Sequence, residues 1–167
     1  GVNIGLTRYR GGSRGPLVLA PGFSVRASSF ATPMVEENLA ESLVAQGYDV
    51  WLFDYRASAD AGNDLQHPPE FTIDAIARHD WPAAIAKIRA VSGAPSVQAL
   101  AHCVGSMSLL MGIGAGWVSG IRSLISSQLT LHPVTDWLNY FKADLGGAGA
   151  LGRISVLDGH LDFVSSG

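Results

Sequence analysis

The stretch LAHCVGSM, residues 100–107, contains the single cysteine of this 167-residue chain, in a setting that could support nucleophilic catalysis. Cys103 follows an apolar run and is separated by one residue from Ala101 and by one residue from Gly105. This spacing matches a nucleophile elbow, with alanine for the first glycine and cysteine for the usual serine. The elbow needs small residues because its turn from strand to helix is tight, and the helix N-terminus favours a thiolate. The spacing therefore predicts Cys103 as a nucleophile, against the alternative of a buried, inert core thiol.

A second segment could supply hydrogen-bond donors to the same place. PGFSV, residues 21–25, is a glycine turn at the end of an apolar run. The backbone N–H of Phe23 could point toward the nucleophile, and the N–H of Val104 would lie directly after it. These two donors would form an oxyanion hole for an acyl-transfer reaction.

The predicted general base and the acid that orients it lie toward the C-terminal end of the sequence. DGHLDF, residues 158–163, follows a last short apolar run and offers His160 as the base. The chain order nucleophile, acid, histidine is the order that this arrangement uses. Asp136 is the first choice for the acid, although it could instead cap a helix that starts near DWLNYF. Asp158 and Asp162 remain alternatives.

The other histidines have structural interpretations. His102 precedes the nucleophile and is expected to point into the structure. His67 and His79 lie in polar segments and are expected to be solvated. For His132, which follows the apolar run 121–129, a structural role is favoured over a catalytic one.

Several further polar residues near the motifs are also interpreted as structural. Ser106 and Ser108 are expected to pack within the helix that follows the elbow. Asp54 and Asp80 are expected to form hydrogen bonds with Arg56 and with nearby backbone.

Short apolar runs alternate with helical patterns and would position these residues. Continuous apolar runs, which suit strands buried on both faces, predict central strands at 16–20, 48–54, 96–102 and 121–129. The segment 5–15 reads as an edge strand and turn, and 153–158 as a last short strand. The alternation predicts a mostly parallel sheet covered by helices on both faces, and ligands of such folds bind beyond the carboxyl ends of the strands.

The helix boundaries follow from caps and prolines. One helix is predicted from Thr32, with an apolar stripe that includes Val35 and Leu39, to a C-terminal glycine at Gly47. A second helical pattern contains Pro82, which would break a helix interior, so a helix start is placed near Asp80. The residues after Cys103 form a third, small-residue helix.

Composition limits the class of protein. The chain is 47% hydrophobic and 15% charged with a formal net charge of −3, which suits one soluble globular domain, 1–167. One cysteine forms no internal disulfide and no zinc site, and suits a cytoplasmic location. The scattered basic residues indicate no nucleic-acid partner, and no apolar run reaches the roughly 20 residues that span a bilayer. The chain starts at Gly1 rather than methionine, which favours excision from a longer protein.

Four stretches together resemble the α/β-hydrolase superfamily on its acid-lipase side. They are GPLVLAPGFSVRASSF, ESLVAQGYDVWLFDYRAS, FTIDAIARHDWPAAIAKIRAVSG and ALAHCVGSMSLLM, and the resemblance covers about residues 5–145. More narrowly, they resemble the α/β-hydrolase domain that accompanies some bacterial glucose-methanol-choline oxidoreductases, the cholesterol-oxidase-like flavoproteins. GHLDF is also similar to the catalytic-histidine segment of acid lipases.

The resemblance implies a three-layer α/β-hydrolase fold, compact or truncated, that hydrolyses a small-molecule carboxylic ester. A thioester as substrate, or acyl transfer in place of hydrolysis, remains open. It implies Cys103 as nucleophile, Phe23 and Val104 as oxyanion donors and His160 as base, with no metal and no organic cofactor. Two departures from the family pattern stand out, namely cysteine in place of serine and a short connection between 145 and 153. The alternative is a truncated or non-catalytic module that accompanies a flavin-dependent, sterol-oxidase-like partner.

Overall fold

The computed structural model describes residues 2–59 and 72–130 of the chain. These residues form a five-stranded sheet in the order β1-β3-β2-β4-β5. β1 is antiparallel to β3, and the remaining pairs of neighbouring strands are parallel. The strands are β1 (Gly5–Tyr9), β2 (Pro16–Ala20), β3 (Asp49–Asp54), β4 (Val97–His102) and β5 (Ile121–Ser127). This mostly parallel sheet confirms the predicted α/β class.

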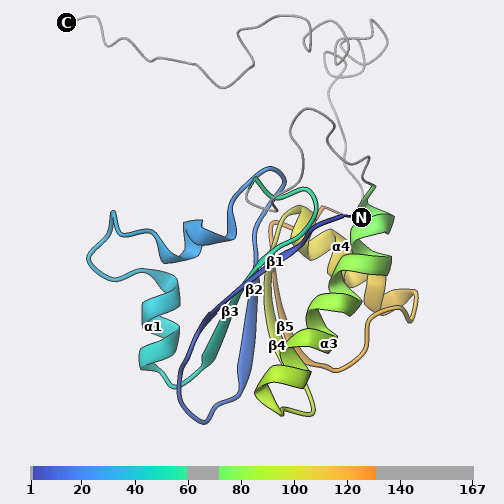
Figure 1. Ribbon diagram of the computed structural model, residues 1–167. Coiled ribbons are helices and arrows are strands. Elements are labelled where there is room, and N and C mark those ends of the chain that lie inside the picture. Colours follow the sequence, from blue (N-terminus) through green and yellow to red (C-terminus); the bar gives the residue numbers. More distant parts are fainter. Residues whose placement is uncertain (1, 60–71, 131–167) are drawn as a thin grey trace, which may run out of the picture. The chain divides into compact units, whose positions relative to one another are not determined.

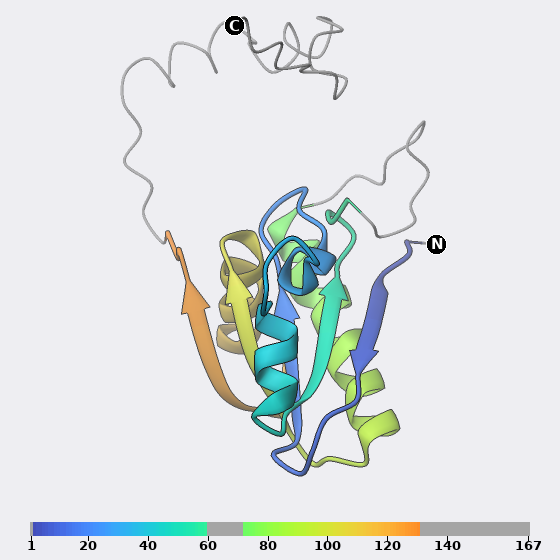
Figure 2. The same cartoon turned by 90° about the vertical axis from the view of Figure 1, so that its left-hand side faces the viewer.

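Helices cover both faces of the sheet, so the described residues form three layers (Figure 1). Figure 2 shows α1 in front of one face, with α3 and α4 behind the other. The helical elements are η1 (Ala27–Ala31), α1 (Leu39–Ala45), α2 (Ile73–Ala75), η2 (Ile76–Asp80), α3 (Trp81–Ser92) and α4 (Val104–Gly114). Within the described residues, no helix has the length and apolar character needed to cross a membrane.

The core lies on both sides of β2 and β3, in which every residue is buried. Successive side chains of a strand point to opposite faces, so the two strands supply both halves of the core. The half under α3 and α4 includes Val18, Ala20, Trp51, Phe53, Trp81, Ile85 and Ile88. The half under α1 includes Leu17, Leu19, Val50, Leu52, Ala27 and Ala40. Burial on both faces explains why these strands appear in the sequence as unbroken apolar runs.

The predicted start of the first helix is wrong. α1 begins at Leu39 and not near Thr32, and Asn38 caps it. The Asn38 side chain accepts from the Glu41 N–H at 2.9 Å, and the Glu41 side chain accepts from the Asn38 N–H at 3.3 Å, which together form a capping box. Val35 therefore lies before the helix and is 52% exposed. The predicted end is right, because Gly47 follows the helix with φ +91°.

The predicted helix start near Asp80 is right in position, because α3 begins at Trp81, but the Asp80 side chain does not cap it. Helical backbone runs without a break from α2 through η2 into α3, because η2 is a π-helical turn. In that turn the Trp81 N–H donates to the carbonyl of Ile76, five residues earlier. A π-turn widens the helix locally, which accommodates Pro82 in the next turn. Asp80 itself has helical dihedral angles and makes no capping hydrogen bond.

The outer strands agree only partly with the prediction. β1 is an edge strand as expected, and β4 lies between β2 and β5, as a central strand should. β5 was expected to be central, but among the described residues it is the outermost strand beside β4, and Ile125 is 62% exposed. The expected strand at 153–158 lies outside the described residues.

Candidate functional site

Cys103 occupies the turn between β4 and α4 and has φ 50° and ψ −117°. Residues other than glycine rarely adopt a positive φ, which costs on the order of 1–3 kcal/mol and persists only where neighbouring contacts impose it. Here the Cys103 N–H donates to the Ser127 carbonyl at 2.9 Å, and the Cys103 carbonyl accepts from the Met107 N–H at 3.0 Å. Strand pairing and the first helical turn thus hold the partly buried thiol at the carboxyl end of the sheet.

The small residues on either side of Cys103 are required by packing. Ala101 is fully buried. A Cβ on Gly105 would lie 2.7 Å from the Pro21 carbonyl oxygen, which is closer than real contacts allow, and 3.1 Å from the Ala20 carbonyl oxygen, which is tighter than most. The N-terminal end of α4 therefore packs directly on the end of β2. This close approach is the physical reason for glycine two residues after the candidate nucleophile.

Ser106 ties the elbow to the neighbouring strand. Its buried hydroxyl contacts the Ala101 carbonyl and lies 3.2 Å from the Ser127 carbonyl, and it accepts from the Ser127 N–H at 3.3 Å. His102 Nδ1 lies 3.2 Å from the Ser127 hydroxyl. Both side chains thus join the ends of β4 and β5, as the structural interpretations of the sequence anticipate.

Ser108 has a similar role on the other side of α4. Its fully buried hydroxyl donates to the Gly105 carbonyl at 3.1 Å and accepts from Trp81 Nε1 at 3.0 Å. Trp81 is itself fully buried at the start of α3. The first turn of α4 is therefore fixed to α3 by a hydrogen bond between side chains.

The turn after β2 lies against the thiol. A Cβ on Gly22 would be at ordinary van der Waals distance from the elbow, 3.4 Å from Cys103 Cβ and 4.0 Å from Cys103 Sγ, so Gly22 lies beside Cys103. The Ser24 N–H donates to the Ala57 carbonyl at 3.0 Å, which fixes the far end of the turn. Phe23 lies between these points with its side chain 53% exposed.

The elbow and this turn carry both predicted oxyanion donors. Val104 is the first residue of α4, and the N–H groups of a first helical turn have no partner within the helix. Beside the turn, an open cavity of about 680 Å³ is lined by residues that include Val25 and Met34. The structure thus brings Cys103 and the turn that carries Phe23 together.

Tyr55 is part of this site and was missed by the sequence analysis. It follows β3, is fully buried, and donates from its hydroxyl to the Pro21 carbonyl at 3.0 Å. Burial raises the pKa of Tyr55 above its usual range, and the nearby Cys103 and Asp54 raise it further, so the phenol keeps its proton. A tyrosine at the carboxyl end of a buried strand was the available signal, because a buried hydroxyl usually finds a partner.

The acids near β3 are structural, as predicted. Asp80 is buried and accepts two hydrogen bonds from the Arg56 side chain, from Nη2 to Oδ1 at 2.7 Å and from Nε to Oδ2 at 3.0 Å. Asp80 also accepts from the Arg56 N–H at 3.0 Å. Asp54 accepts from the Ala27 N–H at 2.8 Å and so holds the start of η1. Both carboxylates fix loops at the carboxyl end of the sheet.

The remaining predicted site residues fall largely outside the described residues. These are His160 and Asp136, together with the alternatives His67, His132, Asp158 and Asp162. His79 is described and is exposed, as expected. Within the described residues, no cluster of three or more His, Cys, Asp or Glu side chains could hold a metal ion.

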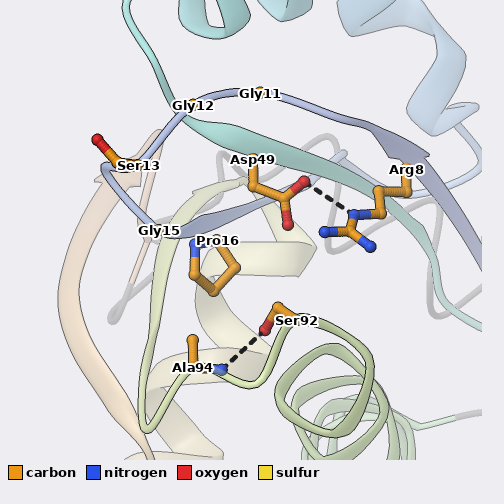
Figure 3. A pocket seen from close by; sticks show the side chains of 9 residues that line it. All are labelled: Arg8, Gly11, Gly12, Ser13, Gly15, Pro16, Asp49, Ser92 and Ala94. Carbon is orange, nitrogen blue, oxygen red and sulfur yellow. Dashed lines mark hydrogen bonds and ion pairs between the residues drawn. The ribbon is translucent and has the colours of Figure 1, made fainter.

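A polar cavity of about 240 Å³ lies at the opposite end of the sheet (Figure 3). Its wall includes the glycine-rich turn after β1, and Arg8 donates from Nε to Asp49 there at 2.8 Å. The second Asp49 oxygen accepts from Trp51 Nε1 at 3.0 Å. Because both carboxylate oxygens are engaged, this pair stabilises the start of β3, and we assign no chemistry to the cavity.

The sheet order, the covering helices and the strained turn after β4 define the α/β-hydrolase fold, and solved structures support this assignment. A marine microorganism esterase matches with a TM-score of 0.61 and 15% identity, over 92% of this chain and 52% of the esterase. An α/β-hydrolase from Sphaerobacter thermophilus matches with a TM-score of 0.58 and 21% identity, over 89% of this chain and 52% of that protein. The three-layer α/β-hydrolase fold predicted from the sequence is confirmed.

Sequence comparison gives a weaker likeness. Triacylglycerol lipase 2 of Arabidopsis thaliana is 25% identical over 146 residues, which cover 84% of this chain and 34% of the lipase. No protein-family model matches the chain. The chain thus spans about a third of the length of that lipase and about half of each solved structure named above. The likeness supports the superfamily, and the narrower resemblance to an oxidoreductase-associated domain stays a prediction.

Proposed function

We propose that this chain hydrolyses carboxylic esters or thioesters, with Cys103 as the nucleophile. The observation that carries the proposal is the position of Cys103, which lies with φ 50° at the start of α4 and against Gly22. In a nucleophile elbow this geometry presents the nucleophile at a helix N-terminus beside amide donors, and the N–H groups of Phe23 and Val104 are the candidates here. The likeness to an esterase and to a triacylglycerol lipase supports an ester as substrate.

The reaction would proceed in two steps. His160 takes the thiol proton, and the thiolate attacks the carbonyl carbon while the Phe23 and Val104 amides stabilise the oxyanion. The bond from carbon to the leaving oxygen or sulfur breaks, and the leaving group takes the proton from His160. Water, deprotonated by His160, then attacks the thioester, which releases the carboxylic acid and restores the thiol. Asp136 would orient the histidine.

The substrate and the location are also part of the proposal. The cavity of about 680 Å³ beside the turn has apolar walls at Val25 and Met34, and suits an acyl chain. A thiol nucleophile must stay reduced, which favours the cytoplasm. An accompanying flavin oxidoreductase, the alternative raised by the sequence, gains no support from the hydrolases named above.

The test uses p-nitrophenyl acetate and the chain's single thiol. Wild-type protein should hydrolyse the ester and, when quenched early, carry one acetyl group on Cys103 by mass spectrometry. Cys103→Ala should abolish both the ester hydrolysis and the acetyl adduct. Ser106→Ala should keep the acetyl adduct, because the buried Ser106 hydroxyl is engaged in structural hydrogen bonds. Hydrolysis by Cys103→Ala at the wild-type rate would refute Cys103 as the nucleophile, and absence of hydrolysis by the wild-type protein would favour a non-catalytic module.

His160 and Asp136 are tested in the same assay. His160→Ala should abolish turnover, and Asp136→Asn should reduce it while the far-ultraviolet circular dichroism stays unchanged. His79→Ala is the matched control, because His79 is exposed. If His160→Ala changes neither turnover nor the pH dependence of thiol alkylation, another residue is the base.

A further inference from the structure

The Pro21 carbonyl is held between two elements that are far apart in the sequence. The fully buried Tyr55 donates its hydroxyl to this oxygen at 3.0 Å, across 34 residues. On another side the oxygen meets the first turn of α4, where a Cβ on Gly105 would lie only 2.7 Å away. The orientation of the peptide group that joins Pro21 to Gly22 is therefore fixed by a hydrogen bond and by close packing.

This peptide group opens the turn that lies against the candidate nucleophile. Gly22 follows directly, and a Cβ there would be 3.4 Å from Cys103 Cβ. The other end of the turn is held from the same segment after β3, because the Ser24 N–H donates to the Ala57 carbonyl at 3.0 Å. Residues 55–57 thus hold both ends of the turn that contains Phe23.

We propose that Tyr55 is a positioning residue, whose hydroxyl orients the turn 21–24 against Cys103 and thereby places the Phe23 amide for the oxyanion. The inference rests on the proposed function, since only an acyl-transfer site needs that amide. Tyr55 acts through Pro21. Misplacing a group in such a site by about 1 Å can cost on the order of 10²-fold in rate, so a single orienting hydrogen bond is enough to matter.

The protonation state of Tyr55 suits this role. Burial raises its pKa, with further contributions from Cys103 and Asp54, so the hydroxyl remains a donor throughout the neutral and mildly alkaline range. The Pro21 carbonyl can only accept a hydrogen bond, and a deprotonated phenol would leave two acceptors facing each other.

The test replaces Tyr55 by phenylalanine in the full chain, which keeps the ring and removes the hydroxyl. Tyr48→Phe is the matched control, because Tyr48 precedes β3 whereas Tyr55 follows it, about 20 Å away along the strand. Amide hydrogen exchange of residues 22–24 reports the position of the turn. Turnover of p-nitrophenyl acetate reports how well the site stabilises the oxyanion. Alkylation by iodoacetamide reports the reactivity of the Cys103 thiol in a reaction that forms no oxyanion.

In Tyr55→Phe we expect faster exchange at residues 22–24, a fall in kcat of about tenfold with KM unchanged, and alkylation within twofold of wild type. The loss should be smaller than the roughly 10²–10³-fold for removing an oxyanion donor, because the Phe23 amide is still present. Tyr48→Phe should change none of the three. A melting temperature lowered by a few degrees is consistent with one lost buried hydrogen bond.

Other results would overturn the inference. Unchanged exchange at residues 22–24 would show that the hydroxyl does not hold the turn, and faster exchange with unchanged kcat would show a merely structural role. If wild-type protein lacks turnover, the proposed function fails and exchange alone decides whether Tyr55 holds the turn. If Tyr55→Phe does not fold, Ser24→Pro displaces the same turn with the tyrosine in place, because proline lacks the N–H that Ser24 donates to Ala57 and cannot adopt its φ of 55°. An unchanged kcat there would also overturn the inference.

Discussion

Replacing Gly105 by alanine tests whether the elbow is as closely packed as the structure indicates. The added methyl carbon would lie 2.7 Å from the Pro21 oxygen, 3.1 Å from the Ala20 oxygen and 3.2 Å from Ala20 Cβ. The two nearer atoms belong to backbone at the end of a fully buried strand, so they cannot rotate away as a flexible side chain could. The N-terminal end of α4 must shift instead.

The size of the effect follows from two opposing terms. Overpacking of a closely packed site costs about 1–3 kcal/mol. Alanine is favoured over glycine in a helix by about 1 kcal/mol, which offsets part of this cost. Gly114→Ala is the matched control, because Gly114 belongs to the same helix and a Cβ there meets nothing within 4 Å. The difference between the two variants therefore isolates most of the steric cost, about 1–3 kcal/mol.

Urea unfolding measures this difference directly. With a typical urea dependence of about 2 kcal/mol per molar, the midpoint of Gly105→Ala should lie about 0.5–1.5 M below that of Gly114→Ala. Iodoacetamide labelling of Cys103 should also change in Gly105→Ala, because the thiol lies in the turn that moves. If both variants unfold at the same urea concentration, α4 does not press on the end of β2 and the packing argument for the elbow is refuted.

Three further predictions concern the elements around the site. Asp80→Ala should lower the unfolding free energy by about 3–5 kcal/mol in urea, because it removes the carboxylate that pairs with the largely buried Arg56 guanidinium. The exposed Asp74→Ala should cost less than 1 kcal/mol, and equal costs would contradict the buried pair. Ser106→Ala should lower the unfolding free energy in urea by about 1–3 kcal/mol, because Ser106 supplies a buried hydroxyl that joins β4 to β5. The control Ser123→Ala should leave this free energy almost unchanged, because Ser123 is exposed. The raised pKa of Tyr55 stabilises the fold below the unfolded value of 10.0, and this contribution is lost as the pH rises. Wild type should therefore lose up to about 1.4 kcal/mol per pH unit above pH 10 relative to Tyr55→Phe, by thermal melting, and parallel pH curves would contradict this.

The sequence predicted the elements whose signals are local. Buried strands such as β2 and β3 appear as unbroken apolar runs because both faces of a central parallel strand are covered. The end of α1 followed from Gly47, and the elbow at Cys103 from residue spacing alone. The start of α1 was misjudged because Pro33 resembles a first-turn proline, although Asn38 provides the stronger capping box.

Contacts between elements were decided only by the tertiary structure. Sequence spacing shows that residue 105 must be small, but only the order of the strands shows that it meets the Pro21 carbonyl. The hydrogen bond from Tyr55 spans 34 residues, and the pairing of Asp80 with Arg56 spans 24. Periodicity and caps report on a few neighbouring residues, whereas such distant partners meet only because β3, β2 and β4 align their carboxyl ends at one edge of the sheet.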